Sequence, residues 1–344
     1  MEFVWIAVAL VAATFSYFIG LRIGKHAVVV QPPDTVPEVV LTSQQEVVEN
    51  RSAKTIPGVK LATKSLSPNP DYASTILALT SDEKPHIIVS TVSVASTRGL
   101  SHIESGLPRQ DNYCILTKSN ETLIVLSDGT SSAEESHLGS LFLVQNFERI
   151  YDEIFPDGSS PDPHKWKELN LKLSQNLVAM FVSRSKQKGE KVPESVTDLR
   201  LAAAAKYAST LEVLIISKKI EGEPLEYIFV RIAGDGGVFR VHDLITQIFV
   251  DETGLNLKEA SVRVLPISDS IPVVFSGRIM PGENLMVATD GIGDFILSND
   301  EWSNALLDYC QMPQPSSVDL LELVTFFDAN SRDDRTLAIV SNAK

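Results

Sequence analysis

The sequence predicts an α+β fold, a four-layer αββα sandwich in which two antiparallel sheets pack together between helix pairs, preceded by an N-terminal transmembrane helix. The folded part shows short strands, a helix pair, a long strand series, a second helix pair and a last strand. This order lacks the regular alternation of strand and helix found in a doubly wound parallel sheet. A separate apolar run stands at the N-terminus, followed by a proline-rich stretch.

The N-terminal run, residues 3–21, consists of apolar or small residues apart from three that carry hydroxyl groups. As a helix, such a run is about long enough to cross a ~30 Å hydrocarbon layer. Arg22 and Lys25 lie only on its C-terminal flank, which by the positive-inside rule leaves the rest of the chain in the cytoplasm. A cleaved secretory signal is the alternative, but the basic start of such a signal is missing. We therefore predict a single-pass membrane protein anchored by residues 1–26.

The next stretch, residues 27–84, is rich in Ser, Thr, Val and Glu and contains six prolines. Its prolines oppose regular helix, and its short apolar clusters lack sustained periodicity. We predict a flexible linker here, and a folded domain over residues 85–344.

The folded domain opens with short β-branched or apolar runs bounded by turn residues, which predict strands. Apolar residues at helical spacing then predict two long helices and a third, shorter one. The predicted strands are 86–95, 113–117 and 122–127, and the predicted helices are 132–154, 165–183 and 196–206.

A long antiparallel series follows, and the chain closes with two helices and one strand. The predicted strands are 210–217, 227–233, 238–241, 246–250, 262–266, 273–279, 284–289 and, last, 336–340. The predicted helices are 300–309 and 317–327.

The composition limits the partners of the chain. A formal net charge of −14 argues against a nucleic-acid backbone as the main partner, because an acidic surface repels phosphate. The same excess of carboxylates suits divalent cations. With only Cys114 and Cys310 present, there is no disulfide framework and no cysteine-rich zinc site, which favours a reducing compartment.

Three predicted strands end in Asp-Gly, at Asp128-Gly129, Asp235-Gly236 and Asp290-Gly291. Each puts a carboxylate at the rim of a sheet, and the glycine lets the backbone approach an ion or water closely. Hard divalent cations prefer such all-oxygen surroundings. One Asp-Gly is more often a turn than a ligand, but three at strand ends favour a metal site.

Two further acidic segments flank predicted strands. Asp333 and Asp334 stand just before the final strand, and neighbouring carboxylates are costly to bury unless a cation or proton neutralises them. A polar loop over residues 101–113, which contains Asp111, leads into an early strand.

Taken in order, these segments resemble the protein phosphatase 2C (PPM-type) family, in particular its divergent microbial branch. The likeness covers about residues 86–342 and is specific as a set, although each piece alone is weak. The matching pieces are Ser101-His102, Gly106-Leu-Pro-Arg-Gln110-Asp111, Asp128-Gly129, Ser136-His-Leu-Gly139-Ser140, Ala208-Ser-Thr210, Gly234-Asp235-Gly236, Ala288-Thr289-Asp290-Gly291-Ile-Gly-Asp294 and Asp333-Asp334-Arg-Thr336.

The resemblance implies metal-dependent hydrolysis of phosphoserine or phosphothreonine in partner proteins, opposing a serine/threonine kinase. A water bridging two Mn²⁺ or Mg²⁺ ions would attack phosphorus in line. The ligands that the resemblance implies for these two ions are Asp128, Asp290, Asp333 and the Gly129 carbonyl, with Asp235 and Asp294 near a looser third ion. The catalytic residues that it implies are Asp128 and Asp111, and Arg109 is added as the nearest candidate to grip the phosphate.

The sequence also departs from the best-known members of this family. Gly106 occupies the place of an Arg that grips the phosphate, and Gln110 that of a Glu. Thr130 stands where a His often acts as general acid, and a threonine hydroxyl is a poor proton donor. His102 is a candidate substitute, although a lone loop histidine is usually structural.

Two other functions compete with this prediction. A catalytically weak, membrane-anchored scaffold that binds phosphoproteins would explain the departures, whereas the retained aspartates favour an active enzyme. A haloacid-dehalogenase-like phosphatase would need a second Asp two residues after Asp128, and Thr130 stands there instead.

Overall fold

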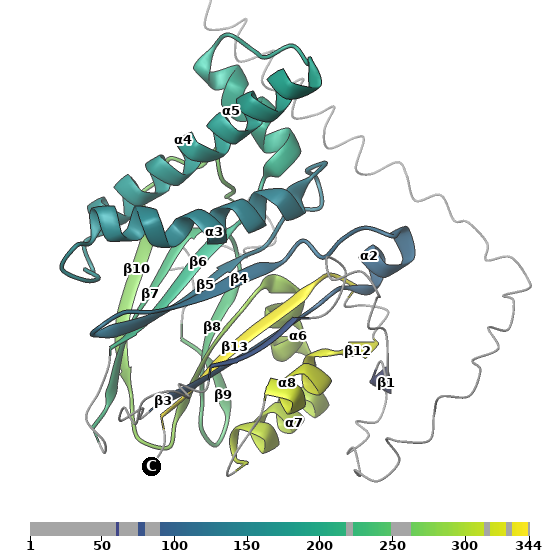
Figure 1. The fold of residues 1–344 in the computed structure, drawn as a ribbon. Helices are drawn as coiled ribbons and strands as arrows, with labels where there is room; N and C mark the ends of the chain where they lie inside the picture. The colour runs from purple at the N-terminus through teal and green to yellow at the C-terminus, as the bar shows by residue number, and fades with distance from the viewer. Residues whose placement is uncertain are drawn as a thin grey trace, which may run out of the picture. The chain divides into compact units, whose positions relative to one another are not determined.

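Two antiparallel sheets form the centre of the computed structural model, which describes residues 60–61, 75–79, 90–217, 223–248, 263–312, 317–327 and 332–342 (Figure 1). The five-stranded sheet has the order β10 (Val273–Ile279), β7 (Leu225–Ala233), β6 (Leu211–Ser217), β5 (Glu121–Ser127), β4 (Asn112–Thr117). The six-stranded sheet has the order β2 (Thr75–Leu79), β3 (Ser90–Thr97), β13 (Arg335–Asn342), β11 (Asn284–Ala288), β8 (Gly237–Val241), β9 (Ile245–Gln247). A small separate pair joins β1 (Lys60–Leu61) to β12 (Phe326–Phe327).

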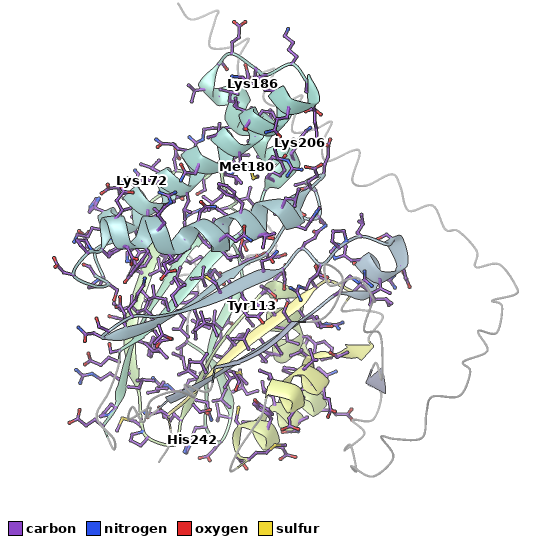
Figure 2. All side chains as sticks on the ribbon, in the orientation of Figure 1. Tyr113, Lys172, Met180, Lys186, Lys206 and His242 are labelled. Carbon is purple, nitrogen blue, oxygen red and sulfur yellow. The ribbon has the colours of Figure 1, made fainter. Side chains whose placement is uncertain are left out.

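Helices cover the outer face of each large sheet (Figure 1). The helices α3 (Ser136–Ile154), α4 (Pro163–Lys188) and α5 (Val196–Tyr207) share one apolar core with the five-stranded sheet. The helices α6 (Asp290–Ser298), α7 (Asp300–Cys310) and α8 (Ser317–Val324) share a second core with the six-stranded sheet. A third core lies between the sheets, and Tyr113, labelled in Figure 2, packs against it. The predicted two-sheet, helix-flanked architecture is confirmed.

The alternation of side chains along β5 shows how the sequence builds these layers. Leu123 and Val125 pack in the core under α3 and α4, whereas Ile124 and Leu126 point into the core between the sheets. Successive residues of a strand face opposite sides, so a strand buried on both faces is apolar throughout. Burying each of these side chains stabilises the fold by roughly 1.5–3 kcal/mol. The strand therefore delivers the next residue, Asp128, to the rim of the sheet.

Some elements differ from the predictions. A short helix, α2 (Leu100–Ser105), occupies part of the predicted polar loop, and it is fixed by hydrogen bonds from Ser101 N and Oγ to the Arg332 carbonyl. The described part of the predicted strand at 262–266 makes only an isolated bridge between Leu265 and Ser209. The helix α6 was not predicted, since two glycines in its first turn disfavour helix.

The predicted N-terminal segments fall mostly outside the described residues. The predicted anchor at 1–26 lies entirely there, and within the described ranges no helix is both long and apolar enough to cross a membrane. Within the predicted flexible linker, Thr75–Leu79 forms β2 and pairs with β3. This part of the linker is thus ordered in the sheet, because it is a short apolar run without proline.

Candidate metal centre

The aspartates that were predicted as metal ligands or catalytic residues lie on segments of both large sheets and are close together. The segments that carry them are the ends of β5 (Asp128) and β11 (Asp290), the β7–β8 turn (Asp235), and the residues just before β4 (Asp111) and β13 (Asp333). Burial and the nearby charges of Asp111 and Asp290 raise the pKa of Asp128 well above its ordinary value. Carboxylates from four chain segments therefore lie within electrostatic reach of one another.

The remaining pKa shifts describe the same convergence. Burial, together with the charges of Asp235 and Asp333, raises the pKa of Asp290 to about 8. Desolvation also raises the pKa of Asp235, and the charge of Asp294, one helical turn beyond Asp290, adds to the effect. Asp333 is exposed, yet desolvation by the surrounding protein raises its pKa as well. Mutual repulsion among carboxylates opposes their common ionisation.

The backbone around Asp128 is fixed by Thr210, the residue just before β6. Its N–H donates to Thr210 Oγ1 over 2.9 Å, and its carbonyl accepts the Thr210 N–H over 2.7 Å. A Cβ at Gly129 would come within 2.9 Å of the Ser136 backbone, so only glycine allows the start of α3 to pack this closely. The Asp128-Gly129 ending thus serves close packing as well as placing a carboxylate.

Asp290 is the first residue of α6, where the helix dipole favours a negative charge. A Cβ on the following residue, Gly291, would lie 2.0 Å from the Asp334 carbonyl oxygen. Another glycine, Gly99, packs against the same segment, where a Cβ would lie 2.2 Å from the Asp333 carbonyl carbon. Asp333 is therefore held between two close backbone approaches.

Asp111 is fully buried, and its Oδ2 accepts hydrogen bonds from Thr289 Oγ1 over 2.8 Å and Thr336 Oγ1 over 2.7 Å. Among the described residues, no hydrogen-bond donor reaches its buried Oδ1, although the Asp128 carboxyl group lies within hydrogen-bonding reach of the Asp111 side chain. Burial and the nearby charge of Asp334 raise the pKa of Asp111 to about 6. A buried oxygen left without a donor is costly, which marks Oδ1 as a position for a ligand.

Asp334 is buried and makes hydrogen bonds through both carboxylate oxygens, whereas the adjacent Asp333 is exposed. Its Oδ1 accepts from Gly99 N over 2.6 Å and contacts His102 Nδ1 over 2.9 Å, and its Oδ2 accepts from Gln110 N. Burial lowers the pKa of His102, but the hydrogen bond to Asp334 leaves a net rise. His102 is buried in this contact, so its position supports the structural role.

A buried ion pair holds the turn that carries Asp235. Arg231 Nε donates to Glu212 Oε1 over 2.9 Å, and Arg231 also donates to the Gly236 carbonyl. Gly234 has φ of +126°, a conformation that a residue with a side chain rarely adopts. The turn is thus rigidly supported on the side of the five-stranded sheet.

The structure also places the residues at which the sequence departs from the family pattern. Gly106 is the left-handed cap that ends α2, with φ of 67°. Gln110 is buried, and its Oε1 has no hydrogen-bond partner within the part of the chain that the structure describes. The Thr130 hydroxyl donates to the Ala208 carbonyl over 3.2 Å. Arg109 Nε donates to the Asp111 carbonyl over 3.0 Å, which places this arginine beside the aspartates.

The donor set fits hard divalent cations. Its carboxylates repel one another, and Asp111 Oδ1 lacks a neutral donor in the described part of the chain, a combination that a cation would relieve. Among the described residues, no three or more His, Cys, Asp or Glu side chains are arranged as ligands of a single ion.

Sequence reasoning assigned no role to Thr289, Thr336 or Asp334. All three stand inside segments that were already singled out for their aspartates. The sequence carries one signal for the threonines. One residue with a hydroxyl group stands one position before Asp290, and another stands three positions after Asp333. Their hydrogen bonds to Asp111 join residues 178 and 225 positions apart, which no local pattern shows.

Comparison with solved structures finds phosphatases at low sequence identity. A serine/threonine phosphatase of S. agalactiae aligns with 74% of this chain and 100% of its own, at 14% identity and a TM-score of 0.48. The catalytic domain of PstP, in complex with two manganese ions, aligns with 73% of this chain and 97% of its own, at 16% identity and a TM-score of 0.45. The search of curated proteins found no match.

Comparison with protein-family models gives a direct result. The family described as protein phosphatase 2C matches residues 98–327, which include the whole five-stranded sheet, the strands β8, β9 and β11 of the six-stranded sheet, and the helices on both. The match contains Asp111, Asp128, Asp235 and Asp290 and ends shortly before Asp333. The chain therefore belongs to the protein phosphatase 2C family, whose members are serine/threonine protein phosphatases.

Proposed function

We propose that this chain hydrolyses phosphoserine and phosphothreonine in proteins with the help of two bound Mn²⁺ or Mg²⁺ ions. The observation that carries the proposal is the convergence of Asp111, Asp128, Asp290 and Asp333. Burial and the charges of Asp111, Asp290 and Asp333 raise the pKa of Asp128, and burial with the charges of Asp235, Asp333 and Asp111 raises that of Asp290. When bound, such ions lower the pKa of water and neutralise charge on the phosphoryl oxygens.

Each residue has a role in this proposal. Asp128, Asp290 and Asp333 would hold the two ions, with the Gly129 carbonyl as a further ligand, and Asp235 and Asp294 would hold a looser third ion. Asp111 Oδ1 would accept a hydrogen bond from the attacking water and so orient it, since no neutral donor among the described residues bonds this oxygen. Arg109 lies beside Asp111 and would contribute positive charge for the phosphate.

The test is a turnover assay with the purified full-length chain, p-nitrophenyl phosphate and a phosphothreonine peptide. We expect turnover with Mn²⁺ or Mg²⁺ and none with chelator. Asp128→Asn removes one ligand charge at constant shape, and the matched control is Asp243→Asn, at an exposed aspartate beside His242 (labelled in Figure 2). Equal turnover in the presence of chelator would reject the metal-dependent mechanism.

A second function, a phosphoprotein-binding scaffold with little catalysis, is favoured by one set of observations. Gly106 supplies no phosphate-gripping side chain, Gln110 carries no charge, and Thr130 bonds the Ala208 carbonyl. The same assay separates the two functions, since a scaffold would bind the phosphopeptide without turnover under any metal condition.

We also retain the proposal of a membrane anchor, formed by residues 3–21, that holds the catalytic domain at the cytoplasmic face, where an opposing kinase would supply the substrate. It is supported by the apolar run and by the basic residues on its C-terminal flank. Cell fractionation tests it, and recovery of the intact chain in the soluble fraction would overturn it.

A further inference from the structure

We propose that Thr289 and Thr336 are positioning residues that hold Asp111 by one carboxylate oxygen, so that its other oxygen, Oδ1, faces the metal centre. This inference rests on the proposed function, because it concerns the same centre. Thr289 stands between β11 and α6, and Thr336 lies in β13. Neither side chain would itself bind an ion.

The first step is the geometry of the buried hydrogen bonds. Both hydroxyls reach the same oxygen of Asp111, Thr289 Oγ1 over 2.8 Å and Thr336 Oγ1 over 2.7 Å. The Thr289 and Thr336 side chains are almost fully buried, at 4% and 0% exposure. Two donors on one oxygen fix the rotation of the carboxylate.

The second step is the direction of each proton. The Thr336 backbone N–H can only donate, and it does so to Thr289 Oγ1 over 3.0 Å. The single hydroxyl proton of Thr289 is then free to point at Asp111. Ser96 Oγ lies 2.7 Å from Thr336 Oγ1, and Ser96 must be the donor there, since the Thr336 proton goes to the carboxylate. Both protons therefore point at Oδ2, and none is directed at Oδ1.

The third step is where these residues stand in the chain. Thr289 immediately precedes Asp290, and Thr336 follows Asp333 by three residues. Thr289 N also donates to the Thr336 carbonyl over 3.1 Å. The two hydroxyls thus link three acidic segments to one another. A β-branched threonine suits this role, because its side chain has few alternative rotamers.

The test compares Thr289→Val and Thr336→Val, which keep the shape and remove the hydroxyl, with Thr289→Ser and Thr336→Ser, which keep the hydroxyl. The matched control is Thr117→Val, an exposed threonine at the end of β4 far from Asp111. Each full-length variant is titrated with Mn²⁺ by calorimetry and assayed with p-nitrophenyl phosphate to separate kcat from KM. Thermal unfolding in chelator checks that each variant is folded.

We expect each valine variant to lose Mn²⁺ affinity and kcat by about 10- to 100-fold, as for other lost outer hydrogen-bond partners of a metal site. The KM stays close to that of the unaltered chain, since neither hydroxyl touches substrate. The serine variants lose less than about tenfold, and Thr117→Val loses nothing. Ser96→Ala removes only the outermost donor, so its loss is smaller than that of Thr336→Val.

Three results would overturn the proposal. Valine variants that bind Mn²⁺ and turn over like the unaltered chain would show that the hydroxyls do not position Asp111. Serine variants that lose as much as the valine variants would show a packing role for the methyl groups. Where the valine variants do not fold, a loss of Mn²⁺ affinity greater than about tenfold in a folded serine variant would overturn the proposal.

The proposed function can fail separately. A chain that binds Mn²⁺ but hydrolyses neither substrate would remove the catalytic proposal, and the affinity comparison would still decide the role of the threonines. A chain that binds no Mn²⁺ would overturn both.

Discussion

The two ends of β5 carry carboxylates in opposite surroundings. At its start, buried Glu121 accepts hydrogen bonds from Tyr151 Oη, from Ser159 N over 3.2 Å to each oxygen, and from Ser159 Oγ over 2.5 Å. At its other end, the neighbours that act on Asp128 include Asp111, Asp290 and Asp333.

The difference shows how structural and functional carboxylates can be told apart. Glu121 is satisfied by neutral donors and closes the turn before α4, where Trp166 Nε1 also donates to the Ser160 carbonyl over 2.7 Å. Asp128 faces other acids, an arrangement that is unfavourable without a cation or a proton. The first carboxylate should therefore matter to stability, and the second to metal binding and turnover.

The largest expected effect is on catalysis at Asp128. Asp128→Asn should lower metal-dependent kcat by about 10³-fold or more, equivalent to about 4 kcal/mol in the barrier. Its unfolding midpoint in chelator should equal or exceed that of the unaltered chain, because one repulsive charge is removed. Kinetics measures the loss of kcat, and thermal unfolding measures the midpoint. A large loss of stability in chelator would show that the Asp128 carboxylate serves mainly to stabilise the fold.

The next effect is stabilisation by metal. Mn²⁺ at about 100 times its Kd should raise the free energy of unfolding by about 2.7 kcal/mol. Denaturant titration with Mn²⁺ and with chelator measures the difference. Asp128→Asn serves as the control, and the same stabilisation in that variant would mean that the ion binds elsewhere.

At the other end of the strand, Glu121→Gln should cost about 2 kcal/mol of unfolding free energy. The new amide group cannot accept the hydrogen bonds that one carboxylate oxygen accepts now, and a buried donor is left without a partner. Turnover per folded molecule should not change. The matched control is Glu226→Gln, at an exposed glutamate, and a comparable stability loss there would show that the effect is not specific to burial.

The smallest expected effect concerns Lys118, just before Glu121. Its ammonium group lies 2.6 Å from Glu148 and 2.9 Å from Asp152, both exposed on α3. Exposed ion pairs contribute little, so Lys118→Met should lower the unfolding free energy by less than about 1 kcal/mol. Chemical denaturation measures this, and a loss as large as that of Glu121→Gln would erase the distinction between the two kinds of contact.

The local sequence pattern predicted the strands that position the aspartates. A strand that is buried on both faces is apolar throughout, so it ends at a charged residue such as Asp128 or Asp290. The pattern missed α6, whose glycines are poor helix formers. Those glycines are required by tertiary packing, since a Cβ at Gly291 would lie 2.0 Å from the Asp334 carbonyl oxygen. The two-sheet architecture and the aspartate convergence followed from the sequence and the family resemblance, but the order of the strands within each sheet did not.

The hydrogen-bond partners could not be predicted in this way. Nothing local distinguishes Asp334, which holds Gly99 and His102, from the adjacent Asp333. The bonds between Asp111 and the two threonines likewise depend on the pairing of β11 with β13. Such contacts are set by how distant strands meet, and a single sequence carries no direct record of that.

The strand β2 has a practical consequence for how the protein is shortened. It covers one side of β3, whose other side pairs with β13. A version that starts at residue 85 would bare a row of unpaired N–H and C=O groups along β3, a surface that invites association with other chains. Soluble versions of the domain should therefore begin upstream of Thr75.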